Sequence, residues 1–259
     1  MKLRLLGSGG WLPTSARETC CAYLREDDSV LLIDAGTGLA RLVEEPALLA
    51  GAERLDVVLT HFHLDHVVGL SYLPALPLRP TLWGPAAALT GTPTGTVLGH
   101  MFGSPLFGAE LEAIVASVCE LPADGRLDVG PWPVAVRRQD LHTDPTLAVR
   151  VGDQLTYCTD TAADAANADF ARGSGLLFHE AWYADATTDD RTHSAAGEAG
   201  HIAATAGVES LVLIHLDPLQ RSHEKLLAAA REEFPRTSLG TDLQPLESLL
   251  TGPPGPGFG

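Results

Sequence analysis

The chain has 259 residues, of which 45% are hydrophobic and 19% charged, and its formal net charge at pH 7 is −16. This composition supplies enough apolar material for a large core, so it excludes a disordered chain and a disulfide-held mini-protein. An acidic surface repels nucleic acid and anionic membranes, and the densest basic run is only Arg137-Arg138. No stretch of about 20 apolar residues is present. We therefore expect neither broad nucleic-acid binding nor membrane insertion.

Short apolar runs alternate with helical patterns along the chain. The predicted strands are 2–6, 20–25, 30–34, 56–60, 81–83, 134–138, 147–151, 154–159, 175–179 and 210–215. The predicted helices are 39–49, 65–73, 106–118, 195–206 and 222–233. Strands in series with interposed helices are typical of an α/β fold in which helices cover the sheets. The Gly- and Pro-rich stretch 84–105 fits neither pattern and is expected to be a mobile flap or a loop over a site.

The termini and the cysteines bear on the compartment and on domain organisation. The apolar part of the N-terminus is too short for a signal peptide. The four cysteines form no CxxC pair: Cys20, Cys21, Cys119 and Cys158. Buried or half-buried thiols in a reducing cytoplasm are therefore expected. No linker divides the chain, so residues 1–251 are expected to form a single domain and residues 252–259 a flexible tail.

The clearest chemical signal is the segment His61-Phe62-His63-Leu64-Asp65-His66, between a predicted buried strand and a predicted helix. Three imidazoles and a carboxylate are costly to bury without partners. In extended backbone, His61 and His63 share one face and can bind one cation together. Asp65 and His66, in the following helix, point to a second position. Imidazole and carboxylate ligands suit Zn²⁺ and, less selectively, Mn²⁺ or Fe²⁺.

This segment resembles the HxHxDH signature of the metallo-β-lactamase superfamily. Further segments resemble that family in the same order: Leu6-Gly7-Ser8-Gly9-Gly10, Leu32-Ile33-Asp34-Ala35-Gly36-Thr37-Gly38, Tyr157-Cys158-Thr159-Asp160-Thr161, Phe178-His179-Glu180-Ala181, His193-Ser194 and Leu213-Ile214-His215. The last three resemble the ribonuclease Z and phosphodiesterase-like branch, while Thr159 replaces a usual Gly. The resemblance implies a four-layer αββα sandwich, with two mixed sheets face to face, helices outside and metals at one edge.

The resemblance also implies a binuclear metal site with two Zn²⁺ ions, or Mn²⁺ or Fe²⁺ in their place. The implied ligands of the first ion are His61, His63 and His142, and those of the second are Asp65, His66 and His215. Asp160 would bridge the two ions. His142 is the least constrained of these residues, and His100 competes with it. Alternatively, Asp160 ends a strand in an Asx-turn, and His215 is a buried histidine without a ligand role.

The implied catalytic residues are Asp65, His193 and Glu180. Two divalent ions outweigh the charge of two carboxylates, so the site lowers the pKa of a shared water and attracts anionic substrates. His193 precedes a predicted helix with Ser194 as its expected N-cap, where an anion is favoured. By resemblance, His193 faces the scissile phosphate. Glu180 is expected to orient a histidine. Alternatively, His193 is a surface histidine near a helix cap, and Glu180 is an ordinary carboxylate at a strand end.

The spacing between two implied ligands bears on the substrate. Asp160 follows His142 by only 18 positions, whereas the tRNA-processing enzymes of the branch usually carry a long basic arm there. With the acidic charge, this favours a phosphodiesterase acting on small or cyclic-nucleotide phosphodiesters, with RNA a less favoured partner. The alternatives are a ribonuclease Z-type tRNA 3′ endonuclease, a lactonase or thioesterase on the same metals, and a non-catalytic metal-binding module. Because many relatives dimerise, a homodimer is expected.

Overall fold

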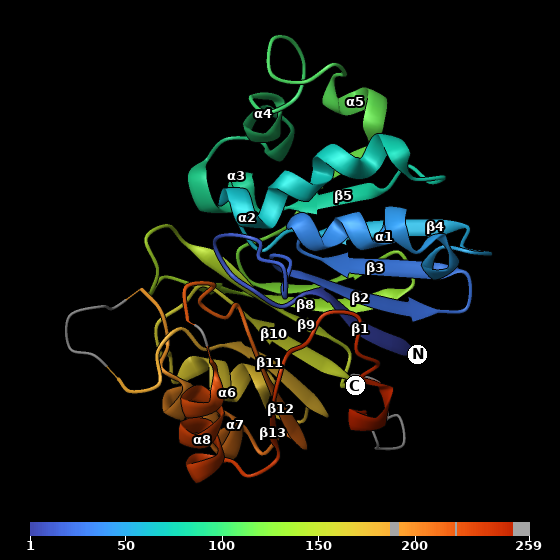
Figure 1. Cartoon of the computed structure of the whole chain (residues 1–259). Coiled ribbons are helices and arrows are strands. Elements are labelled where there is room, and N and C mark those ends of the chain that lie inside the picture. Colours follow the sequence, from blue (N-terminus) through green and yellow to red (C-terminus); the bar gives the residue numbers. More distant parts are fainter. Residues whose placement is uncertain (187–191, 221, 251–259) are drawn as a thin grey trace.

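A computed structural model describes residues 1–186, 192–220 and 222–250. The first part of the chain forms a six-stranded sheet in the order β1-β2-β3-β4-β5-β6 (Figure 1). Its strands are β1 (Lys2–Gly7), β2 (Cys21–Glu26), β3 (Ser29–Ile33), β4 (Arg54–Val58), β5 (Thr81–Gly84) and β6 (Ser117–Glu120). Strands β1 to β3 pair antiparallel, and β3 to β6 pair parallel. Every residue of β3 is buried, as expected for a strand covered on both faces.

The second part of the chain forms a seven-stranded sheet in the order β13-β12-β11-β10-β9-β8-β7. Its strands are β7 (Gly125–Val129), β8 (Trp132–Gln139), β9 (Thr146–Val151), β10 (Leu155–Cys158), β11 (Leu176–Glu180), β12 (Ser210–Ile214) and β13 (Thr237–Leu239). Strands β7 to β10 pair antiparallel, and β10 to β13 pair parallel. The carboxyl ends of β10, β11 and β12 therefore lie side by side.

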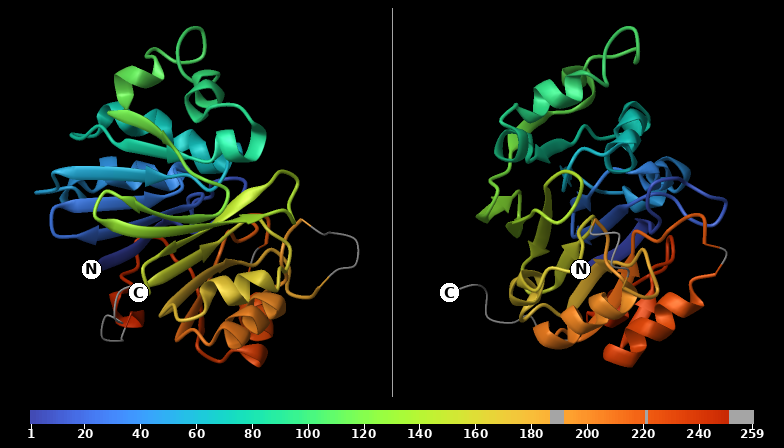
Figure 2. Two further views of the ribbon diagram at one scale, coloured as in Figure 1. Left: turned by 180° about the vertical axis from the view of Figure 1, so that it is seen from behind. Right: turned by 90° about the vertical axis from the view of Figure 1, so that its left-hand side faces the viewer.

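The helices lie outside the two sheets. Those over the first sheet are α1 (Ala40–Glu44), α2 (Leu64–Val67), α3 (Ala86–Thr90), α4 (Thr94–Gly99) and α5 (Leu111–Ile114). Those over the second sheet are α6 (Ala166–Ala171), α7 (Ala196–Ala206) and α8 (Glu224–Glu233). Short 3₁₀ helices cover Thr37–Leu39, Pro46–Leu48, Val68–Ala75 and Glu247–Leu249. Figure 2 shows the two sets of helices on opposite sides of the paired sheets.

The core has three parts that match this layering. Between the sheets, Leu5 and Ile33 of the first sheet and Val149 and Phe178 of the second belong to one buried cluster. A second cluster lies between the first sheet and its helices, and a third between the second sheet and α6 to α8. Burial of apolar area in all three holds the layers together. The predicted four-layer αββα sandwich is confirmed.

Several local predictions were wrong, some because tertiary pairing overrides the local pattern and one because a proline interrupts it. The predicted helix 106–118 is helical only at α5, and its last residues belong to β6, because parallel pairing with β5 overrides the local helical pattern. The predicted helix 39–49 is interrupted at Pro46, which has no N–H to donate. The predicted flap 84–105 contains α3 and α4, which pack on β6. Strands β6, β7 and β13 were not predicted.

Helix α7, which follows the His193-Ser194 segment, forms as predicted but has a different cap. The N–H of Ala195 donates to Oε2 of Glu198 at 2.8 Å. The hydroxyl of Ser194, the expected N-cap, instead donates to the carbonyl of Thr161 at 2.7 Å. The helix ends at Gly207, which adopts the left-handed conformation with φ of 68°. The predicted tail 252–259 lies outside the described residues, and within them no helix is long and apolar enough to cross a membrane.

The cysteines are free and shielded, as predicted. Cys20, Cys21 and Cys158 are buried, and Cys119 is half-buried. Burial raises the pKa of the Cys158 thiol to about 12, and it raises the pKa values of Cys20 and Cys21 as well. The thiolate is the reactive form, so protonated and buried thiols react slowly.

We expect a thiol reagent such as Ellman's reagent, at about pH 8, to modify only Cys119 rapidly in the native protein. All four thiols should react at once after unfolding in guanidinium. Peptide mapping of the modified chain identifies the reactive position. Rapid modification of Cys158 in the native state would contradict its burial at the end of β10, between the second sheet and its helices.

Candidate metal centre

The carboxyl ends of strands from both sheets meet at one edge of the molecule. Asp34 follows β3 and His61 closely follows β4, while Asp160 and His215 closely follow β10 and β12. Contacts between the imidazole of His66 and the carboxylates of Asp34 and Asp160 join the two sheets there. Ligands of open α/β sheets bind outside the carboxyl ends of the strands. This edge gathers side chains from segments far apart in the sequence.

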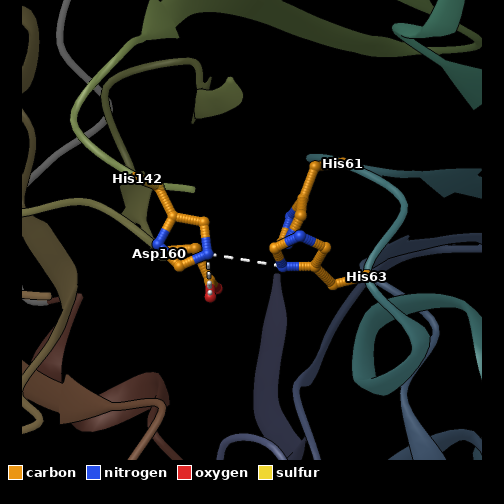
Figure 3. A group of neighbouring side chains, drawn as sticks. All are labelled: His61, His63, His142 and Asp160. Atoms are coloured by element: carbon orange, nitrogen blue, oxygen red, sulfur yellow. Dashed lines mark hydrogen bonds and ion pairs between the residues drawn. The ribbon is translucent and has the colours of Figure 1, made fainter. Parts of the chain in front are cut away.

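One group of possible ligands consists of His61, His63, His142 and Asp160, whose ligand atoms lie within 4.8 Å of one another. His142 Nε2 lies 3.3 Å from His63 Nδ1 and 3.5 Å from Asp160 Oδ1. Figure 3 shows His61 and His63 reaching in from one side and His142 and Asp160 from the other. His100 belongs to no such group in the described part of the chain. Three imidazoles and a carboxylate suit Zn²⁺.

A second group, Asp65, His66 and His215, lies next to the first. Oδ2 of Asp65 is 3.3 Å from His215 Nε2 and 3.5 Å from His66 Nε2. Asp160 lies between the groups, because its Oδ2 is 3.0 Å from His66 Nε2 and 3.4 Å from His215 Nε2. The structure thus brings close together all seven residues that the family resemblance implied as metal ligands.

Two buried ring nitrogens fit a cation better than they fit the protein alone. Nε2 of His61 and Nε2 of His66 are shielded from solvent and lack a well-aligned hydrogen bond within the described residues, although Oδ2 of Asp160 lies 3.0 Å from the latter. The Nδ1 atoms of the same rings are hydrogen-bonded: that of His61 to Thr60 Oγ1 at 3.0 Å, and that of His66 to Asp34 Oδ2 at 2.8 Å. Buried polar atoms normally have partners. The donor set and these two atoms therefore fit divalent metal ions.

The electrostatics of the cluster also favour cations. Burial lowers the pKa of His61 well below its usual value, so its imidazole is neutral and can bind a metal. Burial alone would raise the pKa of Asp160, but His215 and His66 outweigh it and hold that pKa well below the usual range. Burial alone would lower the pKa of His66, but the surrounding carboxylates, Asp160 foremost, raise it well above its usual value. The carboxylates stay ionised and stabilise positive charge here.

Asp34 is a site residue that the sequence analysis did not single out. Its Oδ2 accepts a hydrogen bond from His66 Nδ1 at 2.8 Å, and its Oδ1 accepts from the backbone N–H of Thr60 at 2.8 Å. The Thr60 hydroxyl, which donates to Asp34, also contacts His61 Nδ1. One buried carboxylate thus orients a histidine of each group. A carboxylate directly after the buried run of β3 was the available signal.

We expect Asp34→Asn to weaken metal binding by about 10–100-fold, because the amide turns a donor toward His66 or Thr60 and removes the charge that fixes the ring. Competition with a chromophoric zinc chelator measures this. Asp144→Asn is a matched control: Asp144 Oδ2 lies 3.1 Å from His63 Nε2, but this side chain is 70% exposed and water can replace it. Equal effects of the two substitutions would contradict a special role for the buried carboxylate.

The loop after β1 is fitted tightly against the centre. A Cβ atom on Gly10 would lie 2.5 Å from Cε1 of His215, so only glycine fits there. The next residue, Trp11, donates its backbone N–H to Oδ2 of Asp65 at 2.7 Å. Trp11, Asp160 and His215 all have left-handed backbone, with φ of 58°, 49° and 49°. Such conformations persist in non-glycine residues where the surrounding structure enforces them, commonly at functional sites.

A histidine–carboxylate pair lies beside the two groups. Glu180, the fully buried last residue of β11, accepts a hydrogen bond from His193 Nδ1 on Oε2 at 2.8 Å, and its Oε1 accepts from the N–H of Thr161. His193 also lies close enough to Asp160 and His215 to form a third possible ligand group with them. The geometry thus permits two roles for His193, as a ligand or as a group that faces a substrate.

The candidate ligands lie within a region of the chain that matches a known protein family. A model described as the beta-lactamase superfamily domain matches residues 30–216, which include the ligand groups up to His215. The chain belongs to the metallo-β-lactamase superfamily. The predicted resemblance is therefore confirmed, and the protein is a hydrolase of the metallo-β-lactamase fold. That fold implies the use of divalent metal, in agreement with the grouped histidines and carboxylates.

Individual relatives of this metallo-β-lactamase superfamily member are similar to it in sequence or in fold. The ribonuclease Z of Synechococcus sp. strain WH7803 is 30% identical, over 93% of this chain and 94% of the relative. The solved structure of the metallo-β-lactamase fold protein YhfI from Bacillus subtilis superposes with a TM-score of 0.77 and 22% identity, over 94% of this chain and 98% of that one. The short form of human tRNase Z superposes with a TM-score of 0.68 and 20% identity, over 95% and 98%. The structural likenesses show the fold.

Proposed function

We propose that this protein is a phosphodiesterase that uses two divalent cations, zinc by ligand preference, to hydrolyse small or cyclic-nucleotide phosphodiesters. The ligands proposed for the first cation are His61, His63 and His142, those for the second are Asp65, His66 and His215, and Asp160 is the proposed bridge. The observation that carries the proposal is the hydrogen-bonded pair of His193 and Glu180 beside these groups. Such a pair can handle a proton on a phosphate or leaving oxygen.

The cations and the residues around them would have separate roles in the reaction. When bound, two divalent cations supply Lewis acidity and lower the pKa of the attacking water. Glu180 accepts the Nδ1–H of His193 and so fixes its tautomer, which leaves Nε2 as the nitrogen that meets the substrate. His193 would stabilise negative charge or protonate the leaving oxygen. Helix α7 begins shortly after His193, and its N-terminal dipole favours the same anion.

The shape of the chain supports a small substrate. The 17 residues between His142 and Asp160 contain β9, a tight turn and β10, so no gripping arm extends from them. The alignment with the Synechococcus ribonuclease Z spans 307 positions, more than this chain's 259 residues, so that relative has segments without a counterpart here. The exposed apolar residues Leu64 and Leu141 adjoin proposed ligands. RNA-binding surfaces usually carry Lys and Arg side chains instead.

A tRNA 3′ endonuclease is the second candidate, because the curated relatives that this chain matches over nearly its whole length are named ribonuclease Z. Cleavage of acyl bonds by a lactonase or thioesterase on the same metals is less well supported, since the pair of His193 and Glu180 suits phosphate chemistry. A non-catalytic module is disfavoured by the full donor set. Cytoplasmic location and a homodimer stay predictions.

The test is a substrate panel with protein reconstituted with zinc, manganese or iron. It contains bis(p-nitrophenyl) phosphate, 2′,3′- and 3′,5′-cyclic nucleotides, a precursor tRNA, a lactone and a thioester. We expect about two metal ions per chain by elemental analysis and turnover of the small phosphodiesters. Efficient cleavage of the precursor tRNA alone would establish the second candidate instead. Activity restricted to the lactone or thioester would refute both.

A further inference from the structure

Trp182 lies against the ring of His193. The indole and imidazole rings are stacked, with centroids 4.7 Å apart and planes inclined by 17°. Trp182 follows β11 by two positions, so Glu180 and Trp182 approach the same histidine from one short segment. Glu180 accepts the hydrogen bond of the ring edge, and Trp182 covers a ring face. The edge and a face of His193 are therefore both contacted.

The backbone of Trp182 is held independently of its side chain. Its N–H donates to the carbonyl of Ser194 at 2.9 Å, next to His193 in the chain. Its carbonyl accepts from the side-chain amide of Gln220 at 2.8 Å. These bonds tie β11 to the segment before α7 and to the loop after His215. The backbone that carries the indole is thus held in place, and replacing the side chain keeps these two bonds.

A hydrogen bond at one edge does not by itself fix an imidazole. The ring of His193 can still tilt while Nδ1 keeps its bond to Glu180, and any tilt displaces Nε2. The rings of His142 and His215 also lie against it, with centroids at 4.9 and 5.6 Å. A parallel aromatic plate on one face removes that freedom, and it excludes water from that face. Offset stacking of aromatic rings contributes modestly to the free energy, so the effect falls on geometry more than on folding.

We propose that Trp182 is a positioning residue that acts through His193, holding the imidazole at the angle at which Nε2 meets the scissile phosphate. The inference rests on the proposed function. It also competes with one alternative, because the indole ring lies 5.3 Å from the ring of His215, inclined by 35°. Through that contact Trp182 would act on a proposed metal ligand instead. The two routes differ in whether metal binding changes.

The decisive variant is Trp182→Leu, which keeps an apolar side chain but removes the aromatic ring. Trp182→Phe is the conservative variant, because it keeps an aromatic ring at this position. We expect Trp182→Leu to lower kcat for bis(p-nitrophenyl) phosphate by about tenfold, with KM changed less than about twofold and both cations retained. Trp182→Phe should keep kcat within about threefold of the wild type. In a His193→Ala background, Trp182→Leu should lower kcat by less than about twofold, since its target is gone.

A second readout does not depend on turnover. A parallel indole shields the imidazole protons, so the His193 ring signals should lie upfield in NMR spectra of the metal-loaded wild type and return downfield in Trp182→Leu. Trp83→Phe is the control, because Trp83 is half-buried in β5 and bonded to Asp56, outside the ligand groups. It should leave kcat and the His193 signals unchanged.

Three results would overturn the inference: equal losses of kcat in the wild-type and His193→Ala backgrounds, loss of a cation in Trp182→Leu, or His193 signals that do not move. A wild-type protein that hydrolyses no phosphodiester would instead refute the proposed function. The ring-current shift would then still decide whether Trp182 fixes the imidazole.

Discussion

Asp65→Ala is expected to abolish phosphodiester hydrolysis and to remove one of two bound cations. Its carboxylate contacts both His66 and His215, so without it the second group keeps two imidazoles and only a share of the charge of Asp160. The same oxygen accepts the N–H of Trp11, so the loop after β1 also loses its anchor at the centre. We expect the affinity for the second cation to fall by at least about 100-fold, because loss of a ligand exceeds the usual cost of losing an orienting partner.

Elemental analysis after gel filtration, together with calorimetric zinc titration, measures the result. The expected stoichiometry falls from about two ions to about one. Asp140→Ala is the control, because this exposed carboxylate pairs with Arg138 and belongs to neither ligand group. Retention of both ions with full activity would remove Asp65 from the proposed ligands. Loss of both ions would show that the two groups do not bind independently.

His193→Ala is expected to leave both cations bound and to lower kcat by about 10²–10⁴-fold, the usual contribution of a positioned acid or base. Its ring is oriented by the hydrogen bond to Glu180, and it touches the proposed ligands His142 and His215 through ring contacts. KM should change little if the ring acts mainly on charge that develops in the transition state. Steady-state kinetics and metal content, measured on the same sample, test both halves of the expectation.

Metal content distinguishes the proposed role of His193 from a role as a metal ligand. His193 lies near Asp160 and His215 in a third possible ligand group, so a ligand role is geometrically open. If His193→Ala loses a metal ion, the ligand role is correct and the proton-transfer role is wrong. His201→Ala serves as the control, because His201 lies on α7, is 74% exposed in its side chain and has a carboxylate oxygen of Glu233 at 3.8 Å. It should change neither the metal content nor kcat.

Features that depend on a few neighbouring residues could be predicted from the sequence, whereas features that depend on distant segments could not. Runs such as those of β3 and β12 are fully buried strands, and continuous apolar sequence identifies them without knowledge of their partners. The segment 106–118 failed because the residues of β6 become a strand only through pairing with β5. The short strand β13 was missed for the same reason, since its neighbour β12 defines it.

The candidate site divides in the same way. The alternation of His61 and His63 and the turn into α2 are local, so the sequence alone indicated a metal-binding segment. The other candidate ligands were chosen by family resemblance, and the structure brings them together where parallel strands of two sheets end. Asp34 was passed over because nothing in its own neighbourhood shows that His66 and Thr60 will lie against it.

By itself, the sequence determined the chemistry available to this protein: the donor atoms, the buried strands that end next to them, and an acidic chain without a long insertion before Asp160. The tertiary structure decided which of these atoms share a space. The stacking of Trp182 on His193 and the reach of Asp34 to both histidine groups are contacts between chain segments. Local propensities act over a few residues, whereas such contacts depend on how two sheets pack, and that is settled by burial across the whole chain.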